Sequence, residues 1–391
     1  MKESNFVIAG GGIGGLAAAL GLARQGISSI VLERSPAFGE IGAGIQIGPN
    51  AFHCFDYLGI SDEAREKAVY IDSLILMDAK DGRSICRIPL DDSFRKRFGN
   101  PYAVVHRTDL HDALFNACKR SGLIDLRSRC KVTGYDQDDD GVDVVLDGKA
   151  AVRGDVLIGA DGLHSPVRAQ LVGDGAPKVS GHTTYRCVIP VENMPEDLRW
   201  NAATLWAGPK CHIVHYPLKG SKVFNLVVTY HNDVTEAVTG KPVTKEEVRL
   251  GFEHIHPRAR QIIEHGENWK LWVLCDRDPI LNWVDGKVAL LGDAAHPMLQ
   301  YFAQGACMAL EDAVCLSQMA SRHKDPSVAL QNYCRQRVPR TGRVQLSSRL
   351  IGEYVYHPDG ANAAVRDAVM KAKTPEQWYD TLDWLYRGTG L

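Results

Sequence analysis

The first residues alternate between apolar runs of strand type and one apolar helical run. Residues 6–9 read as a strand, residues 16–23 as a helix and residues 29–32 as a second strand. The sequence GGGIGG occupies residues 10–15, between the first strand and the helix, and Glu33 directly follows the second strand. This order predicts a β-α-β unit with a glycine-rich turn at its first junction.

The glycine spacing predicts a dinucleotide site in this unit. Gly10, Gly12 and Gly15 form G-x-G-x-x-G, in which the glycines permit a tight turn, close approach of a pyrophosphate and close packing of helix on strand. The helix N-terminus would face the phosphates. Glu33 lies 18 residues after Gly15, where a carboxylate binds adenosine ribose and repels a 2′-phosphate. The pattern therefore favours FAD or NAD over NADP.

Two later strands also end in short polar motifs. Residues 155–168 read as a strand, an Asp161-Gly162 turn and a helix, and residues 287–297 as a strand that ends in Gly292-Asp293. Such motifs suit an extended dinucleotide held at several strand ends. Asp293 could accept a hydrogen bond from a ribityl hydroxyl, or it could cap the segment that follows.

The segment from about residue 178 to residue 275 has a different pattern. Strand-like runs alternate with turn residues and predict an antiparallel sheet. A sheet laid over a dinucleotide domain creates a crevice that suits a small apolar ligand. The predicted strands are residues 183–189, 203–206, 212–216 and 223–230.

Composition excludes several classes of protein. The 391 residues carry 45 Lys+Arg and 47 Asp+Glu, so the near-zero charge gives no general attraction to nucleic acid or anionic lipid. The chain shows neither a spanning apolar run nor a signal peptide, and its ten scattered cysteines indicate reduced thiols in a cytoplasmic protein. No metal site is expected: His254 and His256 suggest a solvated face, and residues 138–141 a hairpin turn.

The three motifs, in this order and spacing, resemble those of single-component flavin-dependent aromatic hydroxylases, of the para-hydroxybenzoate and salicylate hydroxylase fold. Within that family the sequence is most similar to the 3-hydroxybenzoate 6-hydroxylases. That closer likeness rests on residues 42–50, 106–111, 208–218 and 296–301.

The resemblance implies bound FAD. It assigns Glu33 to the ribose, Arg107 to the ribityl–pyrophosphate region, Gln46 to the isoalloxazine edge and the helix from Gly305 to the flavin N1/C2=O edge. No second G-x-G-x-x-G unit follows a later strand, so NADH, favoured over NADPH, is expected to bind only transiently. The residues expected to bind FAD are Gly10, Gly12, Ile13, Gly15, Glu33, Arg34, Gln46, Arg107, Asp161, Asp293, Gly305 and Ala306.

The resemblance also implies two catalytic residues, His212 and Gln300. A phenolate is a better nucleophile than a phenol, so a base or strong acceptor at the phenolic oxygen assists aromatic hydroxylation, and histidine suits neutral pH. Tyr216, four residues along the same strand, projects to the same face as His212 and is expected to bind substrate, whereas His215 faces the other side. The sequence leaves the carboxylate acceptor open, with Arg186 as one candidate.

Position 300 separates specificities within the family. Salicylate hydroxylases carry Pro-His where this chain has Gln300-Tyr301, which favours 3-hydroxybenzoate. The implied reaction uses NADH, O2 and a flavin C4a-hydroperoxide to hydroxylate this acid para to its hydroxyl, giving 2,5-dihydroxybenzoate (gentisate). The alternatives are salicylate or 6-hydroxynicotinate with decarboxylation, or a non-catalytic FAD protein that senses aromatic acids.

These observations predict an α/β fold with a Rossmann-type FAD-binding domain, an inserted antiparallel-sheet substrate domain and a helical C-terminus. The FAD-binding domain is predicted to be discontinuous, formed by residues 1–72, 101–177 and 276–345. The substrate domain combines residues 73–100 and 178–275, and residues 346–391 form the helical segment. The resemblance implies a tendency toward homodimers.

Overall fold

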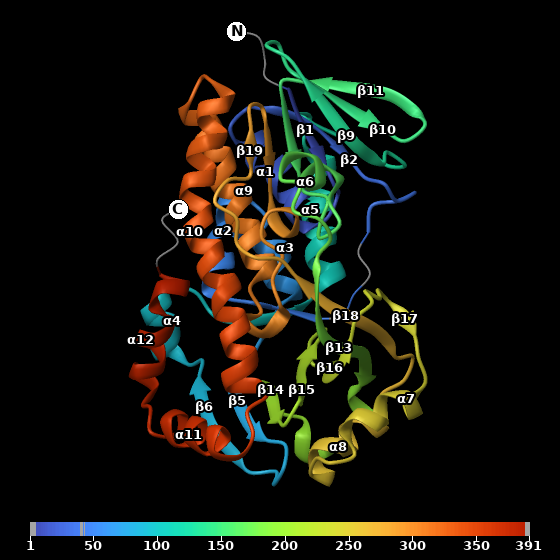
Figure 1. Ribbon diagram of the computed structural model, residues 1–391. Coiled ribbons are helices and arrows are strands. Elements are labelled where there is room, and N and C mark those ends of the chain that lie inside the picture. The colour runs from blue at the N-terminus through green and yellow to red at the C-terminus, as the bar shows by residue number, and fades with distance from the viewer. Residues whose placement is uncertain (1–4, 40–41, 43, 388–391) are drawn as a thin grey trace.

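The computed structural model describes residues 5–39, 42 and 44–387 (Figure 1). Its first layer is a six-stranded sheet in which every neighbouring pair is parallel except the edge pair β19 and β20. Its spatial order is β19 (Val284–Asp285), β20 (Val288–Leu290), β12 (Val156–Gly159), β1 (Asn5–Ala9), β2 (Ser28–Leu32) and β8 (Ile124–Arg127). The central strands are buried on both faces, as their continuous apolar sequences require.

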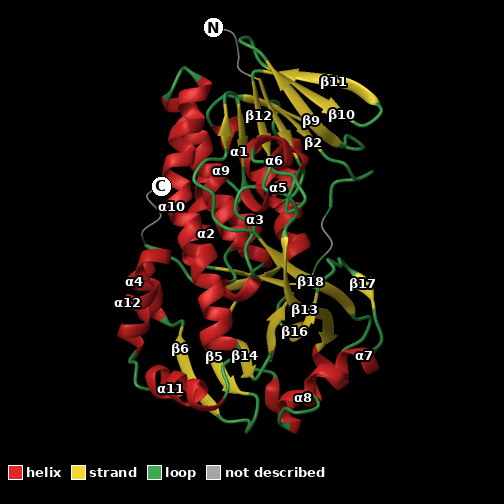
Figure 2. Ribbon diagram, in the orientation of Figure 1, coloured by secondary structure: helices red, strands yellow, loops and turns green. Residues whose placement is uncertain are grey.

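Helices cover this sheet and bury its apolar face (Figure 2). Helix α1 packs on α9 and α5, and α9 packs in turn on α2 and on the long helix α10. Gly21 on α1 permits a close helix crossing, because a Cβ there would lie 3.0 Å from the carbonyl oxygen of Ala313. The bounds are α1 (Ile13–Arg24), α2 (Pro49–Leu58), α5 (Arg107–Arg120), α9 (Gly305–Arg322) and α10 (Pro326–Ile351).

An eight-stranded sheet forms the second layer, below the first in Figure 1. All neighbouring pairs are antiparallel except β14 with β5, which is parallel and is joined by a long connection, not by a hairpin. The order is β17 (Lys241–Pro242), β18 (Lys270–Asp276), β13 (Lys178–Pro190), β16 (Val223–Val234), β15 (Cys211–Leu218), β14 (Ala202–Gly208), β5 (Ser73–Asp78) and β6 (Ser84–Pro89).

Two three-stranded sheets and several short helices complete the described chain. One sheet is β11 (Lys149–Gly154), β10 (Val142–Leu146) and β9 (Val132–Gln137), and the other β3 (Gly44–Ile47), β7 (Ala103–His106) and β4 (Val69–Tyr70). The remaining α-helices are α3 (Ser61–Lys67), α4 (Asp92–Phe98), α6 (Pro166–Leu171), α7 (Lys245–Arg249), α8 (Pro257–Glu264), α11 (Gly360–Lys371) and α12 (Pro375–Tyr386). Single turns lie at Val191–Asn193, Glu196–Leu198, Leu250–Phe252, Gly292–Ala294, Gln300–Phe302 and Gly352–Tyr356. None of the described helices combines the length and the apolar character that crossing a membrane requires.

The predicted elements agree with these, although several extend further than predicted. Helix α9, predicted from Gly305, runs to Arg322; β13 begins five residues before its predicted start, and β16 ends four residues after its predicted end. Residues 138–141 form the predicted turn, between β9 and β10. The boundary predicted at 345/346 falls inside α10, which Figure 1 shows running from the upper sheet down to the lower one.

The C-terminal segment is helical and packs on the body of the same chain. Tyr379 and Tyr386 of α12 meet Phe94 and Phe98 of α4 edge to face, with ring centroids 5.3–6.0 Å apart. The hydroxyl of Tyr379 donates to the carbonyl oxygen of Pro89 at 2.9 Å. These contacts anchor α12 beside β6, and thereby cover one edge of the eight-stranded sheet.

Candidate functional site

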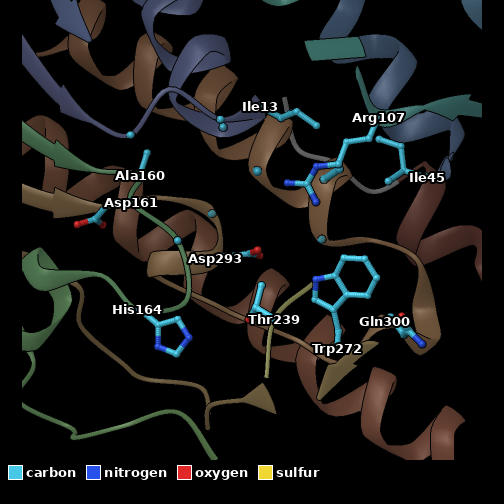
Figure 3. A pocket seen from close by; sticks show the side chains of 18 of the residues that line it. Ile13, Ile45, Arg107, Ala160, Asp161, His164, Thr239, Trp272, Asp293 and Gln300 are labelled. Carbon is cyan, nitrogen blue, oxygen red and sulfur yellow. The ribbon is translucent and has the colours of Figure 1, made fainter. Parts of the chain in front are cut away.

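One cavity of about 860 Å3 is lined by residues from both large sheets. Figure 3 shows Arg107 and Asp293 entering it from the side of the first sheet, and Trp272 and Gln300 from the side of the second. All residues that the sequence assigned to FAD or substrate line this cavity, except Gly15. The motifs scattered over 300 residues of sequence therefore meet at one place.

The glycine-rich turn forms one wall of the cavity. Gly10 has φ +110°, and a Cβ there would lie 2.3 Å from the carbonyl oxygen of Ala160. A Cβ on Gly15 would lie 2.0 Å from the carbonyl oxygen of Gly10, so Gly15 acts through packing and not through ligand contact. The turn leads into α1, whose N-cap Gly12 has no side-chain cap and whose first turn has no acidic residue. This helix N-terminus suits a pyrophosphate.

Glu33 is held at the end of β2 by two backbone amides. Its Oε2 accepts the N–H of Gly11 at 2.8 Å, and its Oε1 accepts the N–H of Ser35 at 2.8 Å. Each carboxylate oxygen has a further lone pair, so the group can still accept the hydroxyls of a ribose. Arg34, next in sequence, lines the same part of the cavity.

Two aspartates follow the strands beside β1. Burial raises the pKa of Asp161, after β12, to about 6, and its Oδ1 is buried without a hydrogen-bond partner among the described residues. Asp293, after β20, is exposed to the cavity and forms no side-chain hydrogen bond to any described residue. The turn Gly292–Ala294 has no side-chain cap, and the carbonyl oxygen of Gly292 accepts the N–H groups of Ala295 and His296, which argues against the capping alternative for Asp293. Carboxylates with unused acceptors fit the hydroxyls of an extended dinucleotide.

The N-terminus of α9 points into the cavity. Gly305 and Ala306 line it, and the first turn of this helix has neither a side-chain cap nor an acidic residue. A buried ion network fixes the helix from behind: Arg337 donates to Glu311 and to Asp312, each at 2.7 Å. The positive end of the helix thus faces the cavity, where it would stabilise negative charge on a bound group.

Gln46 and Arg107 form the opposite wall. The hydroxyl of Tyr102 donates to Oε1 of Gln46 at 2.7 Å, which fixes the amide on β3. Figure 3 shows the Arg107 guanidinium reaching inward from the start of α5. The glycine cradle, the unsatisfied Asp161 oxygen and the two uncapped helix N-termini together fit FAD.

Alternate residues of three adjacent strands form the floor on the substrate side. His212, Val214 and Tyr216 of β15 all line the cavity, as their spacing predicts. Across β16 and β13, the register places His212, Thr229 and Thr184 in one row. Val214, Val227 and Arg186 form the next row, and Tyr216, Asn225 and Val188 the third. His212 and Arg186 thus lie diagonally across the floor.

His212 is buried, with 1% of its surface exposed, and its Nδ1 is 2.8 Å from Nε2 of His357. Burial lowers its pKa well below the ordinary value, and the nearby His182 and His231 lower it further. At neutral pH the ring is therefore neutral, and one of its nitrogens carries a lone pair that can accept a hydrogen bond. His215 lies on the other face of β15, where its Nε2 accepts the indole N–H of Trp206 at 3.2 Å.

Gln300 is held by three polar side chains. Its Nε2 donates to the hydroxyls of Thr184 and Thr229 at 3.2 and 3.1 Å, and its Oε1 accepts from Nη2 of Arg186 at 2.7 Å. Since a guanidinium can only donate, Arg186 determines which end of the amide faces it. The guanidinium also lies over the ring of Trp272, 5.4 Å from its centroid.

Arg186, which the sequence left as one candidate for the carboxylate acceptor, belongs to this site. Sequence reasoning did not assign four further residues to it: Thr184, Thr229, Trp272 and Tyr356. Alternation along β13 would have placed Thr184 and Arg186 on one face, but it could not show which face meets the cavity. Tyr356 comes from the turn after α10, and no sequence pattern connects that turn to the floor.

Comparison with known proteins agrees with this geometry. The family model described as "FAD binding domain" matches residues 3–348. The chain is 54% identical to "3-hydroxybenzoate 6-hydroxylase 1" of Aquipseudomonas alcaligenes, over 98% of each chain, and 49% identical to "3-hydroxybenzoate 6-hydroxylase" of Polaromonas naphthalenivorans, over 97% and 95%.

Solved structures share the whole architecture. A salicylate hydroxylase substrate complex superposes with a TM-score of 0.83 at 25% identity, over 99% of this chain and 96% of the other. Klebsiella pneumoniae HpxO complexed with FAD and uric acid gives a TM-score of 0.86 at 24% identity, over 97% and 96%, which supports the fold. The resemblance drawn from the three motifs is confirmed, and the chain belongs to the FAD-binding family of flavin-dependent aromatic-ring monooxygenases.

Proposed function

We propose that this enzyme hydroxylates 3-hydroxybenzoate para to its hydroxyl group, forming 2,5-dihydroxybenzoate. The balanced reaction consumes NADH, a proton and O2, and releases NAD+ and water. Relatives named for 3-hydroxybenzoate hydroxylation support the substrate. The observation that carries the proposal is the diagonal placement of a neutral histidine and an arginine without a carboxylate partner among the described residues on one floor of the cavity.

The arginine of this diagonal, Arg186, would bind the substrate carboxylate. Burial lowers its pKa, and no carboxylate in the described part of the chain lies within ion-pair distance of it. Its Nε is buried without a partner among the described residues. A desolvated, unpaired cation is costly to the free protein, and an aromatic carboxylate supplies the missing charge and hydrogen-bond acceptors.

The spacing of the floor fits a substituted benzene ring. Arg186 and His212 lie on strands that are two positions apart in the sheet, and they are offset by two residues along the strand direction. This places their backbones about 12 Å apart, a distance that their long side chains and one aromatic ring between them can span. Val214 and Val227 lie in the same row as Arg186, next to the row of His212, and give the ring an apolar surface. One end of the substrate thus meets a cation and the other a proton acceptor.

His212 would take the proton of the phenol. Gln300, whose two amide N–H donors are bonded to Thr184 and Thr229 in the free protein, would hydrogen-bond the same oxygen by exchanging one of these partners for it. A phenol has an ordinary pKa near 10, so ionising it at neutral pH needs an acceptor close by. Bound FAD supplies the transfer of electrons from NADH to O2 and the electrophilic oxygen. Glu33, Arg107, Asp161, Asp293 and the α9 N-terminus would hold it, while the buried floor keeps water from the reacting atoms.

NADH oxidation by the purified holoenzyme tests the proposal. We expect 3-hydroxybenzoate to stimulate it in air and to give one 2,5-dihydroxybenzoate per NADH, whereas salicylate and 6-hydroxynicotinate give neither fast turnover nor carbon dioxide. Carbon dioxide release would establish the decarboxylating alternative. Binding of aromatic acids without any NADH oxidation would favour a sensor. The homodimer and the cytoplasmic location stay predictions of the sequence.

A further inference from the structure

Four histidines from separate elements gather at the end of the substrate floor where His212 lies. His182 of β13, His231 of β16 and His212 of β15 come from adjacent strands, and His357 follows the turn Gly352–Tyr356. The rings of His182 and His231 stack with centroids 3.4 Å apart, and His357 lies 4.2 Å from His231 and 5.0 Å from His212. One of these contacts is a hydrogen bond between two imidazole rings, in which Nδ1 of His212 lies 2.8 Å from Nε2 of His357.

This hydrogen bond comes from the side of His212 away from the substrate. His212 lines the cavity, whereas His357 does not, so His357 meets the histidine from behind. With Nδ1 engaged by His357, the other ring nitrogen of His212, Nε2, is the one that a ligand can meet. A neutral imidazole carries its proton on one nitrogen and accepts at the other.

We propose that His357 is a positioning residue that keeps the proton of neutral His212 on Nδ1. The N–H at Nδ1 of His212 donates to Nε2 of His357, so Nε2 of His212 is presented to the phenol as an acceptor. When the phenol proton moves to this Nε2, the O–H bond breaks, a phenolate forms and His212 becomes a cation that still donates to His357. The inference rests on the proposed function, because it assigns a role to the base of that reaction.

The groups around the His212–His357 hydrogen bond favour the neutral form of both rings. The titratable groups that face it are His182, which is hydrogen-bonded to the hydroxyl of Tyr301, together with His231, Tyr301 and Tyr356. No carboxylate of the described residues forms an ion pair with His212 or His357. Burial and the neighbouring histidines lower the pKa of His357 as well. Both rings are therefore neutral at pH 7, and the hydrogen bond orients His212 without adding a charge.

Two substitutions at position 357 separate orientation from packing. His357→Leu removes the acceptor, and His357→Gln restores one, because the glutamine Oε1 can take the place of the imidazole Nε2. His265→Leu is the control, since it makes the same change at an exposed histidine that ends α8. FAD content and thermal melting of each purified holoenzyme are measured first, so that a misfolded variant is recognised.

The readouts are kcat and KM between pH 6 and 9, and the ultraviolet absorbance of 3-hydroxybenzoate bound to the oxidised holoenzyme, which reports phenolate without turnover. We expect His357→Leu to lower kcat about tenfold at pH 7 with KM nearly unchanged, an effect on the scale of acid–base catalysis. The loss should shrink as pH rises and the phenol ionises without help. We expect His357→Gln and His265→Leu to stay within about threefold of the wild type.

Three results would overturn the inference. The first is a wild-type pH profile and phenolate signal in a fully FAD-loaded His357→Leu enzyme. The second is an equal loss in His357→Leu and His357→Gln at every pH, which would indicate a packing role. The third is a His357→Gln variant that folds and binds FAD but forms no phenolate. If the wild type hydroxylates a different phenolic acid, the substrate proposal fails, and the same comparison with that acid still decides the role of His357.

Discussion

Replacing Arg186 with methionine is expected to move substrate binding and protein stability in different directions. In the free enzyme the guanidinium is desolvated, pairs with no described carboxylate and donates to a neutral acceptor, the Oε1 of Gln300. Methionine fills a similar volume without the buried charge. Replacing buried charges with apolar groups of similar size is often neutral or stabilising by about 1–4 kcal/mol. The melting temperature of Arg186→Met should therefore not fall.

Substrate affinity should fall sharply in the same variant. A guanidinium forms two parallel charge-assisted hydrogen bonds with a carboxylate, each worth about 1.5–3 kcal/mol. Taking about 3 kcal/mol for the pair, the Kd of 3-hydroxybenzoate should rise about 100-fold, since 1.4 kcal/mol is a factor of about ten. The neutral analogue 3-hydroxybenzyl alcohol has no carboxylate, so its affinity should change by less than about threefold.

Flavin absorbance titrations with the acid and the alcohol measure both constants. Lys270→Met is the matched control, because Lys270 is paired with Arg186 in the β13–β18 register and lines the same cavity but is exposed. Because solvent screens an exposed charge, Lys270→Met should raise the Kd of 3-hydroxybenzoate by less than about threefold. An equal loss of acid and alcohol binding in Arg186→Met, or an unchanged Kd for the acid, would refute the carboxylate role.

Three further predictions concern FAD, the base and the buried ion network. Glu33→Ala should weaken FAD binding by about tenfold or more, because the variant loses both the carboxylate expected to accept the ribose hydroxyls and the hydrogen bond to the Gly11 amide. A wild-type Kd for FAD in equilibrium dialysis would contradict this. His212→Ala should lower the rate of hydroxylation at least about tenfold while FAD is retained. The control His215→Gln should keep kcat within about threefold and lower only the melting temperature. A wild-type kcat in His212→Ala would show that His212 is not catalytic. Burial would raise the pKa of Asp312, but pairing with His296 and Arg337 holds it at about 2, below the ordinary value of an unfolded aspartate. About 2 kcal/mol of unfolding free energy should therefore be present above pH 4 and be lost as pH falls toward 2. In chemical denaturation, Arg337→Met should reduce this acid-dependent loss of stability.

The dinucleotide half of the molecule was accessible from sequence because its signals are local. The glycine turn needs particular backbone angles, and the apolar runs that became β1, β12 and β20 are buried on both faces. Parallel strands in one sheet bring their carboxyl ends to the same edge. Glu33, Asp161 and Asp293 could therefore be placed together before the fold was known.

The substrate half was accessible only in part. Alternation along β15 placed His212 and Tyr216 on one face and His215 on the other. Sequence reasoning could not place Arg186, because its meaning depends on the register of β13 with β16 and on the absence of a nearby carboxylate, which is a property of the folded chain. The direction of the Gln300 amide likewise depends on three residues more than 70 positions away.

By itself, then, the sequence determined the class of fold, the glycine turn expected to bind FAD and the strand face that carries the proposed base, His212, since each of these follows from spacing along one segment. Tertiary structure alone decided which residues surround the base. His357 reaches His212 across 145 positions because α10 runs the length of the molecule and delivers the turn Gly352–Tyr356 beside the floor. Contacts of that kind arise from the packing of whole elements, and hydrophobic periodicity, which describes one element at a time, carries no information about them.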